Sequence, residues 1–166
     1  IIFEMDDKKK GYLPLHIACE VNAPIEVIQL LLRYDIENRS IFQKGNWDGK
    51  LPLHIACGNR NTPVEVIQLL LQQDMTKKSL YEKDSWQYIP LHIACVNNVS
   101  SINMIQLLLQ HDIQKESIYV KDKWGKLPLH IACGNTNTSM DIIQLLLQHD
   151  TNNVTLYEKC THYNYL

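Results

Sequence analysis

The chain has 166 residues, of which 45% are hydrophobic and 20% charged, a composition typical of a folded soluble protein rather than a disordered one. With 16 basic and 18 acidic residues its net charge is −2, which argues against nucleic-acid binding, and no apolar run approaches the ~20 residues needed to cross a membrane. The chain begins Ile1-Ile2-Phe3, without an initiator methionine or a signal peptide, as we expect of a fragment of a longer protein.

One seven-residue motif recurs along the chain. LPLHIAC begins at residues 13, 51 and 127, and at residue 89 with Ile in place of the first Leu, so successive copies lie 38 residues apart. Proline is favoured in the first turn of a helix, because the N–H that it lacks has no partner there. The motif therefore predicts short helices that run through the cysteine and begin at Pro14, Pro52, Pro90 and Pro128.

A second apolar block follows each motif after a short polar stretch. The blocks share the sequence Ile-Gln-Leu-Leu-Leu and cover residues 25–32, 64–71, 102–109 and 140–147. A helix with apolar residues on most sides is buried against several neighbours. Stacked repeats supply such neighbours, so the blocks favour a solenoid in which each unit covers the next.

Hydrogen-bonding side chains near the starts of these blocks are predicted helix caps. Thr62 with Glu65 forms a capping box, and Thr138 with Asp141 is similar. Ser100 is predicted to cap the third copy. The first copy has an alanine, Ala23, at this place and lacks the bond.

A small triad and a turn complete each unit. The triads occupy residues 40–42, 79–81, 117–119 and 155–157, and residues 1–3 fall at the same place in the pattern. Phe42, Tyr81, Tyr119 and Tyr157 end the triads, and we interpret them mainly as packing residues. The turns that follow are predicted hairpin tips, and they cover residues 9–12, 47–50, 85–88, 123–126 and 161–164.

This unit resembles the ankyrin repeat, whose marker is Thr-Pro-Leu-His-x-Ala and whose units contain a turn and two helices. Residues 51–56, Leu-Pro-Leu-His-Ile-Ala, match the marker in this copy and in its three counterparts, and residues 48–50 and 124–126 match the family's hairpin. The resemblance covers essentially the whole chain. It implies an all-α fold, an ankyrin-repeat solenoid of stacked helix-turn-helix units with projecting β-hairpin loops.

The resemblance also implies a single ankyrin-repeat domain over residues 1–166. Its parts are a partial leading unit at 1–12, repeats at 13–50, 51–88, 89–126 and 127–164, and the start of a truncated fifth unit at 165–166. The chain departs from the family in its period of 38 rather than ~33 residues, and in the Leu or Ile that replaces the marker Thr. In the family that Thr bonds to the marker His, so we expect backbone groups to hold the histidines here.

The motif histidines are the first candidates for chemistry: His16, His54, His92 and His130. Equivalent atoms of stacked helices lie ~8–10 Å apart, whereas zinc ligands lie ~2.0–2.3 Å from one ion. The histidines therefore cannot share a metal, and we interpret them as structural residues that tie the first helix to the neighbouring hairpin. No metal or cofactor is predicted.

Four of the five cysteines share one position in the motif: Cys19, Cys57, Cys95 and Cys133. A disulfide needs Cα atoms ~4.4–6.8 Å apart, less than the repeat spacing, and the odd count is unlike a secreted disulfide framework. We expect these four to pack as small core residues and Cys160 to be an exposed thiol in a hairpin. The expected location is a reducing compartment, the cytoplasm.

The residues that vary between copies lie at the hairpin tips. By resemblance to the family, the residues that would line one edge of the concave face are Tyr12, Trp47, Lys50, Trp86, Tyr88, Trp124 and Lys126. Exposed Trp and Tyr side chains are typical of binding hot spots. The sequence equally allows each Trp to pack on the next hairpin and stiffen the stack.

These patterns predict a protein-binding scaffold without catalysis, which uses the hairpin tips and the exposed side of the first helices at Glu20, Asn59, Asn97 and Asn135. No nucleophile elbow, P-loop or dinucleotide-binding turn occurs in the sequence. The expected partner is a protein rather than nucleic acid, a membrane or a small molecule, and the chain is expected to be monomeric or part of a larger chain. The alternative is a regulatory or targeting segment of a larger enzyme or channel, which the incomplete units at both ends favour.

Overall fold

The computed structural model of the protein describes residues 11–97 and 102–161. These residues form four pairs of antiparallel helices, each followed by a 3-10 turn. The helices of the pairs are α1 (Pro14–Glu20) and α2 (Ile25–Tyr34), α3 (Pro52–Gly58) and α4 (Val64–Gln73), α5 (Pro90–Val96) and α6 (Ile102–His111), and α7 (Pro128–Gly134) and α8 (Met140–His149). The 3-10 turns are η1 (Ser40–Phe42), η2 (Lys78–Leu80), η3 (Ser117–Tyr119) and η4 (Val154–Leu156).

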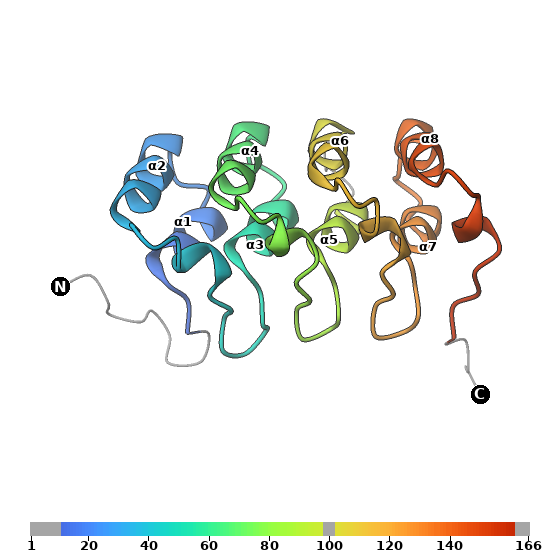
Figure 1. Ribbon diagram of the computed structural model, residues 1–166, viewed down its shortest axis with the longest axis horizontal. Helices are drawn as coiled ribbons and strands as arrows, with labels where there is room; N and C mark the ends of the chain where they lie inside the picture. Colours follow the sequence, from blue (N-terminus) through green and yellow to red (C-terminus); the bar gives the residue numbers. More distant parts are fainter. Residues whose placement is uncertain (1–10, 98–101, 162–166) are drawn as a thin grey trace.

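The pairs stack side by side in two rows. Figure 1 shows α2, α4, α6 and α8 in one row and α1, α3, α5 and α7 in a second row beneath it, with loops projecting beyond the second row. Each helix packs on its partner and on the equivalent helix of the adjacent pair. The predicted all-α solenoid of stacked helix pairs is therefore confirmed.

The short helices begin where the motif predicts. Leu13, Leu51, Ile89 and Leu127 are extended N-cap residues, and the proline that follows each of them opens the helix. The second helices begin differently from the prediction. α4 starts after the N-cap Pro63, and the Thr62 hydroxyl is buried without a hydrogen-bond partner.

The predicted cap of the last helix is also displaced by one residue. Ser139, not Thr138, is the N-cap of α8, and its hydroxyl accepts a bond from the Ile142 N–H at 3.4 Å. In both repeats the chain becomes helical one residue later than the capping-box pattern predicts. The predicted cap Ser100 lies outside the described residues.

The apolar core continues through all four pairs, and burial at equivalent positions depends on the neighbouring repeat. Val27 on α2 is 42% exposed, whereas its counterpart Val66 on α4 is 1% exposed because α2 packs against α4. At the other end of the described stack, Leu156 is 54% exposed, whereas Leu80 is 2% exposed beneath α5. Each repeat thus completes the burial of its neighbour, as expected of a solenoid.

The projecting loops, which we call the fingers, are closed by turns. The first three described fingers cover residues 44–50, 82–88 and 120–126, and no strand is assigned in the ranges that the structure describes. One backbone bond of 2.9 Å closes each finger, from Gly45 N to Lys50 O, from Asp84 N to Tyr88 O and from Asp122 N to Lys126 O. The predicted β-hairpin loops are therefore hairpin-like turns, because legs this short provide no strand ladder.

Neighbouring fingers are joined by backbone bonds. Ser85 N donates to Asp48 O at 2.9 Å, and Lys123 N donates to Trp86 O at 3.1 Å. The fingers therefore form one continuous edge along the stack.

Replacing Gln87 with glycine should stabilise the protein. Gln87 has a φ of 64° at the place where the other fingers have Gly49 and Gly125. A side chain in this left-handed region costs about 1 kcal/mol relative to glycine, so Gln87→Gly should raise the free energy of unfolding by about that amount in urea titrations. The converse change Gly125→Ala is the matched control and should destabilise, since a Cβ there would lie 2.4 Å from Thr161 Oγ1. A destabilised Gln87→Gly would contradict the prediction.

Candidate functional site

The four motif histidines connect each short helix to the next finger. In every repeat Nδ1 accepts a bond from the backbone N–H of the N-cap residue, at 3.1 to 3.2 Å. An imidazole nitrogen that accepts a bond carries no proton, so the proton of the neutral ring lies on Nε2. Nε2 then donates to a backbone carbonyl 27 to 34 residues further along the chain. The distances are 2.9 Å from His16 to Gln43 O, 3.0 Å from His54 to Tyr88 O, 3.2 Å from His92 to Lys126 O and 3.0 Å from His130 to Glu158 O.

Burial keeps the imidazoles of His16, His54 and His92 neutral by lowering their pKa. Desolvation lowers the pKa of His54 and of His92 to about 4, although the carbonyl acceptors act in the opposite direction. The pKa of His16 is lowered for the same reason. Protonation of Nδ1 would also place an N–H against the backbone N–H that it now accepts from. The histidines therefore act as fixed structural links, with one tautomer imposed by their two partners.

Asparagine side chains form a second ladder, on the exposed ends of the short helices. The Asn59 amide donates to the Cys19 and Glu20 carbonyls at 3.1 and 2.9 Å. Asn97 and Asn135 make the equivalent pairs of bonds, all at 3.3 Å, to the preceding repeat. These residues were predicted to belong to the binding surface, and the structure places their amides on carbonyls left unpaired at the preceding helix end.

Aspartates form a third ladder, at the ends of the long helices. Asp112 accepts bonds from Ser117 N and Oγ at 2.9 and 2.5 Å, and also from the Tyr81 hydroxyl of the preceding repeat. Asp150 accepts a bond of 2.9 Å from the Tyr119 hydroxyl. Asp112 and Asp150 thus fix the loops after α6 and α8 and link each loop to the repeat before.

The cysteines follow the burial of their repeats. Cys19, Cys57 and Cys95 are buried free thiols, and burial raises the pKa of Cys19 and of Cys95 to about 12. Cys133 is exposed, contrary to the expectation that all four lie in the core, because among the described residues no repeat covers this face of α7. Cys160 is half-buried rather than exposed.

The predicted tip residues lie in three different environments. Tyr12 is 7% exposed, and its hydroxyl donates to the Asp48 carboxylate, so it adds little to the surface. Trp47 is 71% exposed. The other tip residues are half-buried, and they are Lys50, Trp86, Tyr88, Trp124 and Lys126.

The aromatic tip residues contact one another from finger to finger. The Trp47 and Trp86 rings meet edge to face with centroids 6.4 Å apart, and Tyr88 lies 5.9 Å from Trp124. The Lys50 ammonium lies 5.7 Å from the Trp86 ring centroid, within the range of a cation–π contact. The aromatic row thus stiffens the finger edge while part of each ring remains exposed.

Buried aspartates set the shape of two fingers. Asp84 Oδ1 accepts bonds from the N–H groups of Trp86 and Tyr88 at 2.9 and 2.8 Å, and Asp122 Oδ1 accepts two of 2.8 Å from Trp124 and Lys126. The second oxygen of each carboxylate is buried without a hydrogen-bond partner, and burial raises the pKa of Asp84. The tip side chains are therefore held on a constrained backbone.

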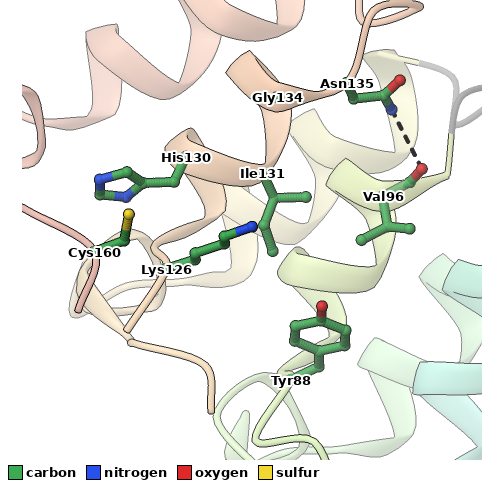
Figure 2. A pocket seen from close by; sticks show the side chains of 8 residues that line it. All are labelled: Tyr88, Val96, Lys126, His130, Ile131, Gly134, Asn135 and Cys160. Atoms are coloured by element: carbon green, nitrogen blue, oxygen red, sulfur yellow. Dashed lines mark hydrogen bonds between the residues drawn. The ribbon is translucent and has the colours of Figure 1, made fainter. Parts of the chain in front are cut away.

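Two hollows lie beside these fingers, and we call them together the groove. The smaller, of 180 Å³, is lined by Lys50, Asp84, Trp86, Tyr88, Ile93 and Val96. The larger, of 420 Å³, is lined by Tyr88, Val96, Lys126, His130, Ile131, Gly134, Asn135 and Cys160. Figure 2 shows Ile131 and Val96 facing the larger hollow, with the Lys126 side chain extending along its edge and Tyr88 below.

The described residues offer no evident site for a metal ion. Within 11–97 and 102–161, no three His, Cys, Asp or Glu side chains lie close enough together to hold one. None of the helices in these ranges has the length and apolar character needed to cross a membrane.

Comparison with known protein families agrees with this architecture. A family model described as ankyrin repeats (3 copies) matches residues 2–80 and residues 64–157. The chain belongs to the ankyrin repeat family. Ankyrin repeats are generally protein–protein interaction modules and are typically non-catalytic. No curated protein sequence matches the chain.

The asparagine and aspartate ladders were not identified from the sequence as links between repeats. The signal is present, because Asn59, Asn97 and Asn135 recur every 38 residues, as the motif histidines do. The aspartates recur with nearly the same period, at Asp35, Asp74, Asp112 and Asp150. A polar residue that recurs with the repeat period is therefore a candidate for a bond between repeats.

Acidification should destabilise the stack through its histidines. The folded pKa of His54 and of His92 is about 4, below the ~6.5 of an unfolded chain. Between pH ~6.5 and about 4 the unfolded state binds more protons than the folded state. The contribution of the two neutral histidines to the free energy of unfolding is therefore complete above pH ~6.5 and is lost as the pH falls toward about 4. Urea titrations at about pH 7 and about pH 5 should show this loss. His54→Gln removes one of these titrating groups, so its free energy of unfolding should fall less between the two pH values than that of the wild type. An equal fall in both proteins would contradict the attribution of the pH dependence to His54.

Removing one tyrosine hydroxyl should weaken the stack only where that hydroxyl is bonded. Tyr81→Phe removes the bond to Asp112 and should lower the free energy of unfolding by about 1 kcal/mol. Tyr157 has the equivalent position in the fourth repeat and is 83% exposed. Tyr157→Phe is therefore the matched control, with no expected change in the urea midpoint. Equal effects of the two substitutions would show that the bond from Tyr81 to Asp112 contributes nothing to the free energy of unfolding.

Proposed function

We propose that this protein is a non-catalytic binding scaffold that holds a protein partner in its groove. The observation that carries the proposal is a groove bordered by aromatic residues and lysines on fingers whose backbones are bonded to one another. A surface constrained in this way loses little conformational entropy when it binds. Half-buried Trp and Tyr side chains provide contact area of the kind that dominates binding hot spots.

The groove combines recurring motif residues, such as Ile93 and Ile131, with finger residues that differ between repeats. Lys50, Tyr88 and Lys126 occupy the same place in three fingers, whereas the helix motif beneath them is nearly constant. The repeated residues make the histidine ladder and the core. Variation at the fingers on a constant framework is consistent with a surface that selects a partner.

We also propose a reducing, cytoplasmic location. Three buried free thiols in the core of the stack support it, because cytosolic proteins rarely contain disulfides. Alkylation of the protein isolated from its own cells, with and without prior reduction, should then modify the same number of thiols after denaturation. A lower number without reduction would contradict this location.

The tip aromatics can be tested by affinity capture followed by measured affinities. A partner retained by the wild-type protein should bind Trp86→Ala/Trp124→Ala at least about tenfold more weakly, a loss of ~1.4 kcal/mol. Tyr34→Ala on α2 is the control, since Tyr34 is an exposed aromatic outside the groove, and it should leave the affinity unchanged.

A second variant separates binding from stability. No atom lies within 4 Å of a Cβ built at Gly134, so Gly134→Phe should fill the larger hollow while leaving the fold intact. Its urea midpoint should match that of the wild type, and partner affinity should fall. A folded Gly134→Phe that binds every captured partner with wild-type affinity would overturn the proposed groove.

A further inference from the structure

The groove combines apolar walls with positive charge at its rim. Ile93 and Val96 line the smaller hollow, and Val96 and Ile131 line the larger one. One lysine belongs to each hollow, Lys50 to the smaller and Lys126 to the larger. An apolar side chain with a nearby negative charge would complement either hollow.

The carboxylates of the fingers balance this charge only in part. The three fingers 44–50, 82–88 and 120–126 hold six lysines and four carboxylates. Glu82 pairs with Lys44, Asp48 lies 4.0 Å from Lys50, and Lys121 pairs with Glu158 outside these ranges.

Asp48, Asp84 and Asp122 are buried, and each accepts bonds from the backbone of its own finger. The finger lysines lie closer to solvent, and Lys121 and Lys123 are exposed. Six lysines and four carboxylates give the three fingers a net charge of +2, although the chain as a whole carries a net charge of −2. Such an edge attracts acidic partners over distances of about a Debye length.

The two hollows are arranged in line along the stack. They share Tyr88 and Val96, so these two side chains form the ridge between them. The hollows are lined by consecutive repeats, and packed helices lie ~8–10 Å apart. A segment in the polyproline II conformation advances ~3.1 Å per residue with three residues per turn, so side chains three residues apart lie on one face and match this spacing.

From these features we infer that the groove recognises an acidic linear segment of a partner protein, with two apolar side chains about three residues apart. The larger apolar side chain enters the 420 Å³ hollow between Val96 and Ile131. Carboxylates beside the apolar residues lie against Lys50 and Lys126. This inference rests on the proposed function and specifies the chemistry of the partner.

Selection from a random library of linear peptides, displayed on phage, tests the inference. Peptides that bind the wild-type protein should be enriched in Asp and Glu beside large apolar residues. The affinity of a synthesised binder should fall at least about tenfold for Lys126→Glu. Arg33→Glu changes the net charge equally on α2, outside the groove, and should leave the affinity nearly unchanged.

A pair of variants at Gly134 separates charge from size. Gly134→Glu and Gly134→Gln place side chains of nearly the same shape at the edge of the larger hollow, where a Cβ meets no neighbour. The glutamate variant should bind the acidic peptide several-fold more weakly than the glutamine variant, and the difference should shrink in high salt. Equal affinities would overturn the inference, as would failure to select any peptide.

The outcomes distinguish this inference from the proposed function. Peptides that lose affinity with Gly134→Phe but lack carboxylates would overturn the acidic specificity and leave the groove as the binding surface. Peptides whose affinity is unchanged in Gly134→Phe and in Trp86→Ala/Trp124→Ala would overturn both.

Discussion

The arrangement of the whole stack depends on the neutral imidazole that joins each short helix to the following finger. In His54, Nδ1 closes the start of its own helix, and Nε2 fixes the finger at the end of the same repeat. One ring thus fixes the position of the finger relative to the short helix. Because both contacts require the same tautomer, burial that lowers the histidine pKa preserves the geometry as well as the charge state. Leu51 stands where the family marker has threonine, and its backbone N–H provides the bond to His54 Nδ1.

Much of the fold could be predicted from one-dimensional patterns. The period of 38, the proline that opens each motif and the Ile-Gln-Leu-Leu-Leu blocks were sufficient to predict the helix pairs and their stacking. The helix caps could not be predicted to the residue, because Thr62-Pro63 and Thr138-Ser139 each offer two possible starting points. Bonds such as that from Tyr81 to Asp112 depend on the path of the loop, and the local sequence does not contain that information.

The sequence left open whether the tryptophans pack or bind, and the structure gives them contacts without burying them completely. Trp47 and Trp86 meet edge to face, so each ring restricts the other. The same contact leaves Trp47 largely exposed. Stiffening and recognition are compatible here, because a ring that is already immobilised loses less entropy when a partner covers it. Tyr12 differs from the other aromatic tips, since its hydroxyl is bonded to the buried Asp48.

The ladders of identical bonds have an evolutionary consequence. Each asparagine link between repeats joins the same kind of donor to the same kind of acceptor, as the bonds from Asn59, Asn97 and Asn135 to the preceding helices show. Duplication or loss of the gene segment that encodes one 38-residue repeat would therefore place each asparagine amide beside an equivalent helix-end carbonyl. The length of the stack can therefore change in a single genetic step that keeps these asparagine bonds, while substitutions at the fingers alter the surface independently.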